Sequence, residues 1–246
     1  MFVKLFDNMD LNLKYNQMIR STLSIEETLD LIYENKLSVS RFGDGEIQMT
    51  NTVRECAFET PSYYGTSKLR TVITEKHEKL LICLSGDAKG EFWESFWKRE
   101  FSKFSHYLDF RLYGNTAISR STVFHKLENK AVDKWQRIWA DRDVVFVTGR
   151  GSRFDSDHIL FSNIKNKEVV LSQPKGAIDD IPRLLSDLSK KSKDTLILLA
   201  LGPAATILAY ELTLLGYQAI DIGHINSCYD HVYNGALVPE KLPMEN

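Results

Sequence analysis

Short apolar runs alternate along the chain with stretches in which apolar side chains recur every three or four residues. Runs of the first kind are typical of buried strands, and stretches of the second kind are typical of amphipathic helices. The apolar runs predict strands at 37–42, 80–84, 143–148, 168–172, 195–201 and 217–222. The periodic stretches predict helices at 24–35, 67–79, 91–104, 116–129, 131–140, 177–190 and 204–215. Strands that alternate with helices predict an α/β fold: a Rossmann-like, doubly wound and mainly parallel sheet flanked by helices.

A few segments refine this pattern. The run 195–201 is apolar on both faces, which predicts an interior strand of a parallel sheet. Ser24 and Glu27 have the spacing of a capping box at the start of a helix. Residues 63–66 are interpreted as a loop. The stretch 91–104 is rich in Phe and Trp at helical spacing, which favours a packed helix face over a platform for base stacking.

The composition is typical of one globular domain. The 246 residues are 43% hydrophobic and 26% charged, and we expect a single domain over 1–246 with its core at about 24–229. A net charge of -2 and the lack of a basic stripe argue against a nucleic-acid partner. The three cysteines are widely spaced, which favours reduced thiols in a reducing compartment.

One apolar stretch approaches the length of a membrane span. Residues 195–215 are mostly apolar, but Gly202 and Pro203 interrupt them near the middle and Glu211 lies in the second half. A strand, a turn and a buried helix explain this stretch better than a span does. The N-terminal residues have no signal-peptide core. We therefore expect a soluble, cytoplasmic protein with no transmembrane segment.

Polar clusters follow the predicted strands at the ends where each strand finishes. In doubly wound sheets, ligands bind outside the carboxyl ends of the strands, so these clusters are the candidate site. They are Asp44 with Glu46, the segment 85–87, the segment 149–153, Gly202 with Pro203, and Asp221 with His224.

The acidic cluster Asp44-Gly45-Glu46 follows the first predicted strand and the turn residue Gly43. In an extended backbone, alternate side chains point the same way, so both carboxylates can face one point. Such a pair repels unless a divalent cation or a shared proton lies between the two groups. Gly45 would let an ion or phosphate approach the backbone, and Arg41 is a ready anion partner. The alternative is an ordinary helix start, with Asp44 as the N-cap and Glu46 in the first turn.

The turn Gly202-Pro203-Ala204-Ala-Thr206 joins the interior strand to a helix. Pro203 suits the first helical position, and the small residues leave the helix N-terminus open to phosphate. A tight turn chosen for packing alone explains the same residues equally well. No G-x-G-x-x-G motif links a first strand to its helix, which disfavours ordinary dinucleotide binding.

The segment Gly149-Arg-Gly-Ser-Arg153 and His224 complete the candidate residues. Arg150, Ser152 and Arg153 suit a pyrophosphate group, although loop arginines are commonly just solvated. A neutral imidazole at His224 could complete a Mn²⁺ site with Asp44 and Glu46, or it could be a hydrogen-bonded structural residue.

Three motifs in this order resemble the GT-D glycosyltransferases. They are Ser40-Arg-Phe-Gly-Asp-Gly-Glu46, Leu201-Gly-Pro-Ala-Ala-Thr206 and Gly216-Tyr-Gln-Ala-Ile-Asp-Ile-Gly-His224. The resemblance runs from about Ser24 to Tyr229. It implies a Rossmann-like fold, a D-x-E metal motif and a nucleotide-sugar donor, as in bacterial enzymes that build surface glycans.

The resemblance also implies roles for particular residues. Asp44 and Glu46 would hold Mn²⁺ (or Mg²⁺) against the pyrophosphate of a UDP-sugar, and the Gly202 turn and His224 would border that site. The chain departs from the family pattern in two segments that could shape the donor or acceptor pocket. These are Ser152-Arg-Phe-Asp-Ser-Asp-His158, in place of Ser-Arg followed by Gly-x-Gly-Asn-Asp, and Pro174-Lys-Gly-Ala177, where an Asn-Ala pair commonly follows the proline.

The sequence therefore predicts a metal-dependent glycosyltransferase that moves a sugar from a UDP-sugar to a glycan or glycoprotein acceptor. The cation would neutralise the departing diphosphate, with Arg150 and Arg153 adding charge-assisted contacts. Asp221 or Asp155 would be the general base for the acceptor hydroxyl. The alternative is a nucleotide-sugar-binding accessory subunit of a glycan-assembly complex, without turnover of its own. A homo-oligomer is compatible with either function.

Overall fold

The apolar runs of the sequence pair into one parallel sheet. The computed structural model describes residues 2–56, 59–86 and 90–237. Within them the sheet has seven strands in the order β3-β2-β1-β7-β6-β4-β5, and every strand pair is parallel. This confirms the predicted α/β class. The strands are β1 (Ser38–Phe42), β2 (Leu80–Leu84), β3 (Gly114–Asn115), β4 (Asp143–Gly149), β5 (Asn166–Ser172), β6 (Leu196–Ala200) and β7 (Gln218–Asp221).

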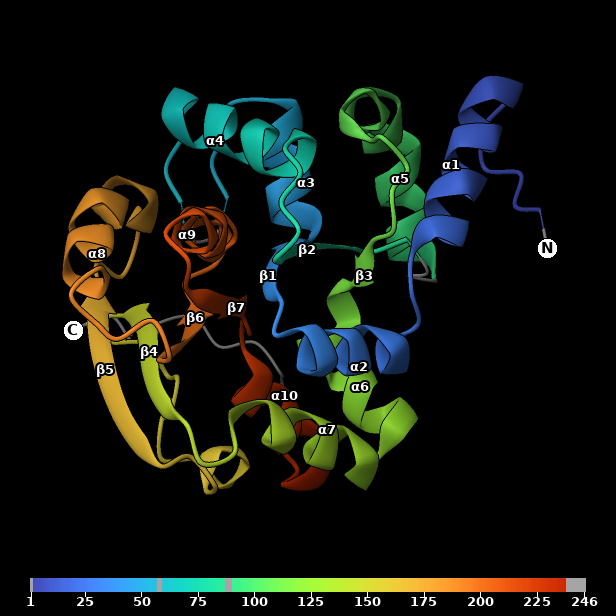
Figure 1. Ribbon diagram of the computed structural model, residues 1–246. Coiled ribbons are helices and arrows are strands. Elements are labelled where there is room, and N and C mark those ends of the chain that lie inside the picture. Colours follow the sequence, from blue (N-terminus) through green and yellow to red (C-terminus); the bar gives the residue numbers. More distant parts are fainter. Residues whose placement is uncertain (1, 57–58, 87–89, 238–246) are drawn as a thin grey trace.

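Helices cover both faces of the sheet (Figure 1). One face carries α1 (Met9–Ser21), α3 (Asp44–Asn51), α4 (Tyr63–Thr74), α5 (Glu91–Phe104), α8 (Ile181–Leu188) and α9 (Pro203–Leu214). The other carries α2 (Ile25–Asn35), α6 (Ser121–Leu127), α7 (Asn129–Trp139) and α10 (Ile225–Tyr233). Short 3-10 helices lie at η1 (Ser105–Tyr107), η2 (Thr116–Ser119), η3 (Ile159–Phe161) and η4 (Ala177–Asp180). Each layer buries its own hydrophobic cluster against the sheet.

Strand β6 and helix α9 form the most completely buried unit. The side chains of 196–199 are fully buried, as expected for a strand with helices on both faces. Helix α9 packs over β1 and β7, and Thr206 fastens it there. The Thr206 hydroxyl donates to the carbonyl oxygen of Arg41 at 2.8 Å, and the Ser40 hydroxyl donates to the carbonyl oxygen of Thr206 at 2.8 Å. The stretch 195–215 is therefore a strand, a turn and a buried helix, as predicted. Among the described residues, no helix combines the length and the apolar character needed to cross a bilayer.

Several boundaries differ from the predicted ones. Residues 63–66 are the first turn of α4 rather than a loop, because the Ser62 hydroxyl accepts a hydrogen bond from the Gly65 N–H at 3.0 Å and caps the helix. The predicted helix 177–190 divides into η4 and α8, with Pro182 at the start of α8. The predicted helices 116–129 and 131–140 become η2, α6 and α7. Helices α1 and α10 and the short strand β3 were not predicted from the sequence, and α3 was predicted only as the alternative to an extended segment.

The capping box of α2 forms as predicted. The Ser24 N–H donates to Glu27 Oε2 at 2.9 Å, and the Glu27 N–H donates to the Ser24 hydroxyl at 3.2 Å.

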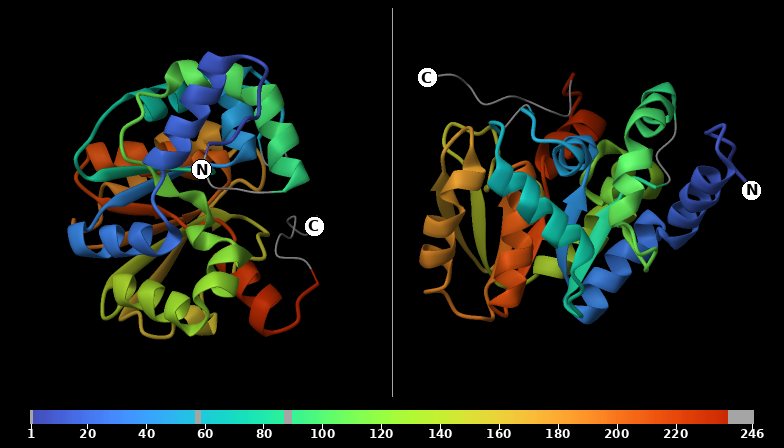
Figure 2. Two further views of the ribbon diagram at one scale, coloured as in Figure 1. Left: turned by 90° about the vertical axis from the view of Figure 1, so that its right-hand side faces the viewer. Right: turned by 90° about the horizontal axis from the view of Figure 1, so that it is seen from above.

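Helix α5 lies beside α1 at one flank of the molecule (Figure 2). Its aromatic side chains at 96, 97, 101 and 104 are buried, which confirms a packed helix face for that part of the helix.

Candidate functional site

A cavity of about 1010 Å³ lies at the carboxyl ends of five neighbouring strands. Strands β2 and β3, which follow β1 in the chain, lie on one side of β1 in the sheet, whereas β7 and β6 lie on the other side of β1. The cavity therefore opens at the point where ligands bind in doubly wound sheets. We call it the strand-end cavity. Its lining includes Arg41, Asp44, Gly45, Glu46, Ser85, Phe92, Trp93, Asn115, Thr116, Arg120, Gly202, Pro203, Asp221, Gly223 and His224.

The acidic pair lies on a helix and not on an extended segment. Gly43 is the N-cap of α3, Asp44 is its first residue, and Glu46 Oε2 accepts a hydrogen bond from the Gly43 N–H at 2.9 Å. The predicted extended geometry is therefore wrong, and the alternative of a helix start is correct, with the N-cap one residue earlier than predicted. Both carboxylates nevertheless line the cavity, and a Cβ atom added to Gly45 would have no neighbour within 4 Å. This open space fits the expected approach of a ligand to the Gly45 backbone.

Arg41 and Asp221 form a largely buried ion pair at the floor of the site. Arg41 Nη2 donates to Asp221 Oδ1 at 2.7 Å, and Arg41 Nε donates to the carbonyl oxygen of Asp221 at 2.9 Å. The Gly223 N–H also donates to Asp221 Oδ1, at 3.1 Å. Gly223 has a φ of +49°, and a Cβ atom there would collide with the Arg41 guanidinium. This packing holds the ion pair in one geometry, and loss of either partner would leave a buried charge without compensation.

Negative charge concentrates around Glu46. Burial raises the pKa of Glu46 to about 7, and the nearby carboxylates of Asp221 and Asp44 add to this rise. The charged form of Glu46 is therefore unfavourable, and a bound cation would stabilise it.

Positive charge lies near His224. Burial lowers the pKa of His224 to about 4, and Arg120 and Arg41 lower it further. Burial also lowers the pKa of Arg120, and Arg41 contributes to that shift. His224 is therefore a neutral imidazole at pH 7, beside guanidinium groups suited to an anionic ligand.

The structure brings together only part of the predicted site. Arg150, Ser152, Arg153 and Asp155 are not among the residues that line the strand-end cavity. In the loop after β4, Ser152 and Asp155 instead accept hydrogen bonds from backbone N–H groups two residues on, at 3.1 and 2.8 Å. Ala204 and Thr206 are buried within α9. Asp87 lies outside the described residues.

The cavity residues at the end of β3 and directly after it were not predicted from the sequence. Asn115, Thr116 and Arg120 all line the cavity. Strand β3 has two residues, too few to show an apolar alternation, so the polar cluster after it could not be recognised as a strand end. The available signal was the dense run Asn115-Thr-Ala-Ile-Ser-Arg120, with its amide, hydroxyl and guanidinium groups.

Comparison with known families decides which kind of domain has this site. The family model of the glycosyltransferase GT-D fold matches residues 39–246. The chain belongs to this glycosyltransferase family. The matched range contains Asp44, Glu46, the Gly202 turn and His224, and the match confirms the resemblance to the GT-D glycosyltransferases.

Two curated proteins are similar to this GT-D domain. The glycosyltransferase GlyD of Streptococcus pneumoniae serotype 4 is 32% identical over 225 residues, which are 86% of this chain and 28% of that protein. The probable glycosyl transferase Gly of Streptococcus gordonii is 30% identical over 231 residues, which are 88% of this chain and 33% of that protein. The chain thus spans about a third of the length of these relatives.

Solved structures of the same kind superpose closely on the GT-D domain. A structure of the domain of unknown function 1792, described as having a distinct glycosyltransferase fold, has a TM-score of 0.80 at 31% identity and covers 93% of this chain and 88% of its own. A DUF1792 glycosyltransferase from Streptococcus sanguinis has a TM-score of 0.78 at 28% identity, covering 90% and 87%. These likenesses agree with the observed parallel sheet.

The three predicted metal ligands do not form one cluster in the structure. In the described part of the chain, no three His, Cys, Asp or Glu side chains lie close enough together to hold a metal ion. The set Asp44, Glu46 and His224 is therefore not assembled as a three-ligand cluster. Divalent cations in phosphate sites commonly take only one or two protein carboxylates and fill their remaining positions with water and phosphate oxygens. The two carboxylates in the cavity, one of them with a raised pKa, fit that simpler kind of site.

Proposed function

We propose that this GT-D domain transfers a sugar from a nucleoside-diphosphate sugar, with UDP as the nucleotide, to a hydroxyl group of a glycan or glycoprotein acceptor. The observation that carries the proposal is the charge arrangement of the strand-end cavity. Carboxylates on α3 and guanidinium groups from β1 and the start of α6 line one space at the strand ends. Carboxylates suit the metal ion of a metal–diphosphate complex, and guanidinium groups suit its phosphate oxygens.

The start of α9 supports the binding of a diphosphate. Gly202 has a φ of +54°, which glycine adopts readily, and it turns the chain from β6 into the helix. Gly202 and Pro203 both line the cavity. The N–H groups and the dipole of a helix favour an anion at such an end. Arg120 would supply a side-chain cation to the same anion, in the role predicted from the sequence for Arg150 and Arg153.

Asp44 and Glu46 would hold the Mn²⁺ or Mg²⁺ ion. When bound, the ion supplies Lewis-acid stabilisation of the charge that develops on the departing diphosphate. Binding would also relieve the repulsion that contributes to the raised pKa of Glu46. His224, neutral at pH 7, would donate a hydrogen bond to the same complex.

Of the two predicted general bases, the geometry supports Asp221 over Asp155. Asp221 lines the cavity, whereas Asp155 lies in the loop after β4. The ion pair with Arg41 fixes the orientation of the Asp221 carboxylate. The acceptor hydroxyl would give up its proton to this carboxylate as the new glycosidic bond forms.

The test is the release of UDP from a panel of UDP-sugars, with Mn²⁺ and with a chelator. We expect release that requires the metal, and a fall in kcat of about 100-fold or more for Asp44→Asn, which corresponds to about 2.7 kcal/mol of barrier. Glu27→Gln is the matched control, because Glu27 caps a helix as Glu46 does but lies at the exposed start of α2. Binding of UDP without any release would identify the accessory-subunit alternative. Absence of both binding and release would contradict the proposal.

A further inference from the structure

Two aromatic side chains at the start of α5 are only partly covered by the core. Phe92 is 58% exposed and Trp93 is partly exposed, and both line the strand-end cavity, whereas the later aromatic residues of the same helix are buried. A single exposed apolar side chain is ordinary in a soluble protein. Here, however, two neighbouring rings face a cavity that is otherwise rich in polar groups.

The two rings are held in place by the aromatic core behind them. Phe92 and Trp93 meet edge to face, with centroids 5.3 Å apart and planes at 84°. Phe92 also stacks on Phe96 at 6.2 Å, and Trp93 lies 6.2 Å from Trp97. Phe96 and Trp97 are buried, so the exposed rings rest on a fixed base. We call Phe92 and Trp93 the aromatic corner.

The aromatic corner lies toward the opposite end of the cavity from the start of α9. Helix α5 follows β2, whereas α9 follows β6, and β1 and β7 separate these two strands in the sheet. Three strand spacings amount to about 14 Å. The carboxylates of α3, which follow β1, lie between the two ends. A donor diphosphate at α9 and the carboxylates would leave the β2 and β3 side for a second substrate.

We propose that the aromatic corner is the acceptor subsite and binds a pyranose ring of the acceptor. This inference rests on the proposed function. The C–H groups on one face of a sugar ring are weakly positive and complement the negative face of an aromatic ring. Ser85 and Asn115, at the ends of β2 and β3, form part of the polar wall on the same side of the cavity. Their polar groups are hydrogen-bonded to Thr116, Leu23 and Ala117, which fixes this wall beside the two rings. An apolar surface flanked by a few polar groups is the usual composition of a small-molecule site.

Intrinsic fluorescence gives a readout that does not depend on activity. Of the four tryptophans, Trp97, Trp135 and Trp139 are fully buried, so a sugar that binds at the corner changes mainly the emission of Trp93. The probes are a panel of methyl pyranosides, titrated into the protein with Mn²⁺ and UDP present. Binding of UDP itself is measured separately by calorimetry.

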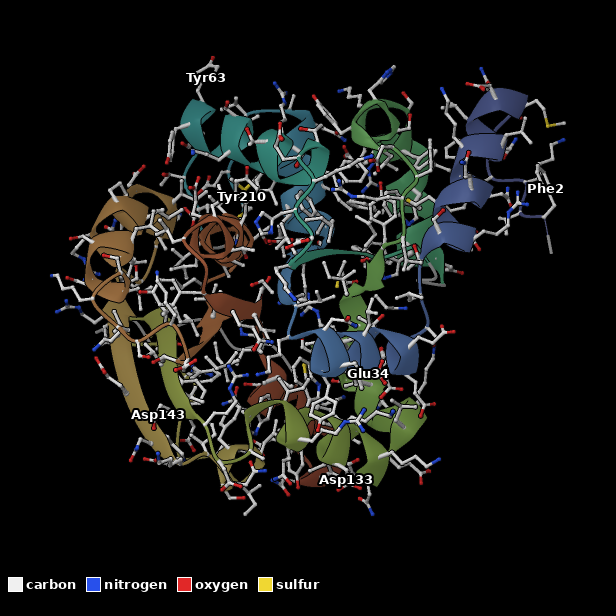
Figure 3. The ribbon with its side chains drawn as sticks, viewed as in Figure 1. Phe2, Glu34, Tyr63, Asp133, Asp143 and Tyr210 are labelled. Carbon is white, nitrogen blue, oxygen red and sulfur yellow. The ribbon has the colours of Figure 1, made fainter. Side chains whose placement is uncertain are left out.

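Variants of Phe92 distinguish the contribution of an aromatic ring from that of apolar surface area alone. Phe92→Ala and Phe92→Leu should each raise the Kd of the bound pyranoside at least tenfold, while Phe92→Tyr stays within about threefold of the wild type and UDP affinity stays within about twofold. Tyr63→Ala is the control, because Tyr63 is an 85% exposed aromatic residue that points away from the molecule on α4 (Figure 3).

Each contrary outcome has a distinct meaning. Equal pyranoside affinity in Phe92→Ala and the wild type, or no pyranoside binding in a wild type that binds UDP, overturns the acceptor subsite. Weaker UDP binding in Phe92→Ala also overturns it, because the corner would then stack the nucleobase. A wild type that neither binds UDP nor releases it from a UDP-sugar refutes the proposed function instead.

Discussion

Replacing Glu46 by Gln should make the protein more stable at alkaline pH. The pKa of Glu46 rises from 4.5 to about 7 in the folded protein, mainly through burial. Between these two values the folded state holds a proton that the unfolded state has lost. The free energy of unfolding therefore falls as the pH rises through this window. The glutamine side chain of the variant would carry no charge at any pH, and its amide oxygen can still accept the hydrogen bond from the Gly43 N–H.

The size of the effect follows from the pKa difference. Each pH unit of difference corresponds to about 1.4 kcal/mol, so full ionisation of Glu46 costs about 3 kcal/mol of stability. Part of this loss is already present at pH 5. Between pH 5 and pH 8, the free energy of unfolding of Glu46→Gln should therefore rise by about 2–3 kcal/mol relative to the wild type. For a chain of this length, that is a relative gain in Tm of about 5–10 °C.

The assay is urea unfolding of the wild type, Glu46→Gln and Glu27→Gln at pH 5, 6, 7 and 8. Hydrogen bonds from Ser24 lower the pKa of Glu27, so the carboxyl group of Glu27 is ionised in both the folded and the unfolded state over most of this range. The curve of Glu27→Gln should therefore run nearly parallel to that of the wild type. Saturating Mn²⁺ should flatten the wild-type curve, because a cation at Glu46 stabilises its charged form, and should leave Glu46→Gln unchanged.

Two results would refute this reasoning. Wild-type and Glu46→Gln curves that stay parallel from pH 5 to pH 8 would show that Glu46 is ionised at little cost in the folded protein. A Mn²⁺ effect of the same size in both proteins would show that the ion binds elsewhere.

Three further predictions concern neighbouring residues of the cavity. The pKa of His224 is about 4 in the folded protein against 6.5 ordinarily, so the free energy of unfolding falls as the pH drops below 6.5. In urea unfolding, the free energy of unfolding of His224→Gln should rise by about 2 kcal/mol relative to the wild type between pH 7 and pH 4.5. Parallel curves for the two proteins would contradict this prediction. The free energy of unfolding of Gly223→Ala, measured in the same way, should be about 1–3 kcal/mol lower than that of the wild type, because the added Cβ atom displaces Arg41 from Asp221 and the residue has a positive φ. An unchanged unfolding midpoint would show that the ion pair adapts. Gly45→Ala should fold at least as stably as the wild type, since its Cβ atom has no neighbour within 4 Å, but should weaken Mn²⁺–UDP binding in calorimetry; unchanged affinity would place the ligand away from this backbone.

Local sequence patterns were sufficient for most of the fold. Strand β6 and the turn at Gly202 were predicted because an unbroken apolar run indicates a buried strand, glycine permits the positive φ of a turn, and proline fixes φ at the first helical position. The capping box of α2 formed for the same reason, since Ser24 and Glu27 need only each other's backbone. Helix α3 was predicted only as the alternative, with its N-cap at Asp44 instead of Gly43. The capping contact between Gly43 and Glu46 is also local, but a glycine N-cap gives no side-chain signal.

Helix α5 shows what a periodic sequence pattern can predict and what it cannot. Helical spacing predicted a packed face on α5, and the aromatic residues at 96, 97, 101 and 104 do pack. The same spacing could not reveal that Phe92 and Trp93 extend beyond the core into the strand-end cavity. That depends on where the start of α5 lies relative to β2 and β3, which is a property of the sheet and not of the helix.

The sequence by itself determined the α/β class, the strand-end position of the site and the family motifs around Asp44 and Glu46, because each of these rests on residues that are near neighbours in the chain. Only the tertiary structure decided which charges face one another. Arg41 and Asp221 are paired across 180 residues of chain, and Arg120 reaches the cavity from a segment that follows a strand too short to predict. The raised pKa of Glu46 and the lowered pKa of His224 arise from burial and from these distant partners. Such shifts depend on separation in space and on exclusion of water, and a linear pattern of residues contains neither.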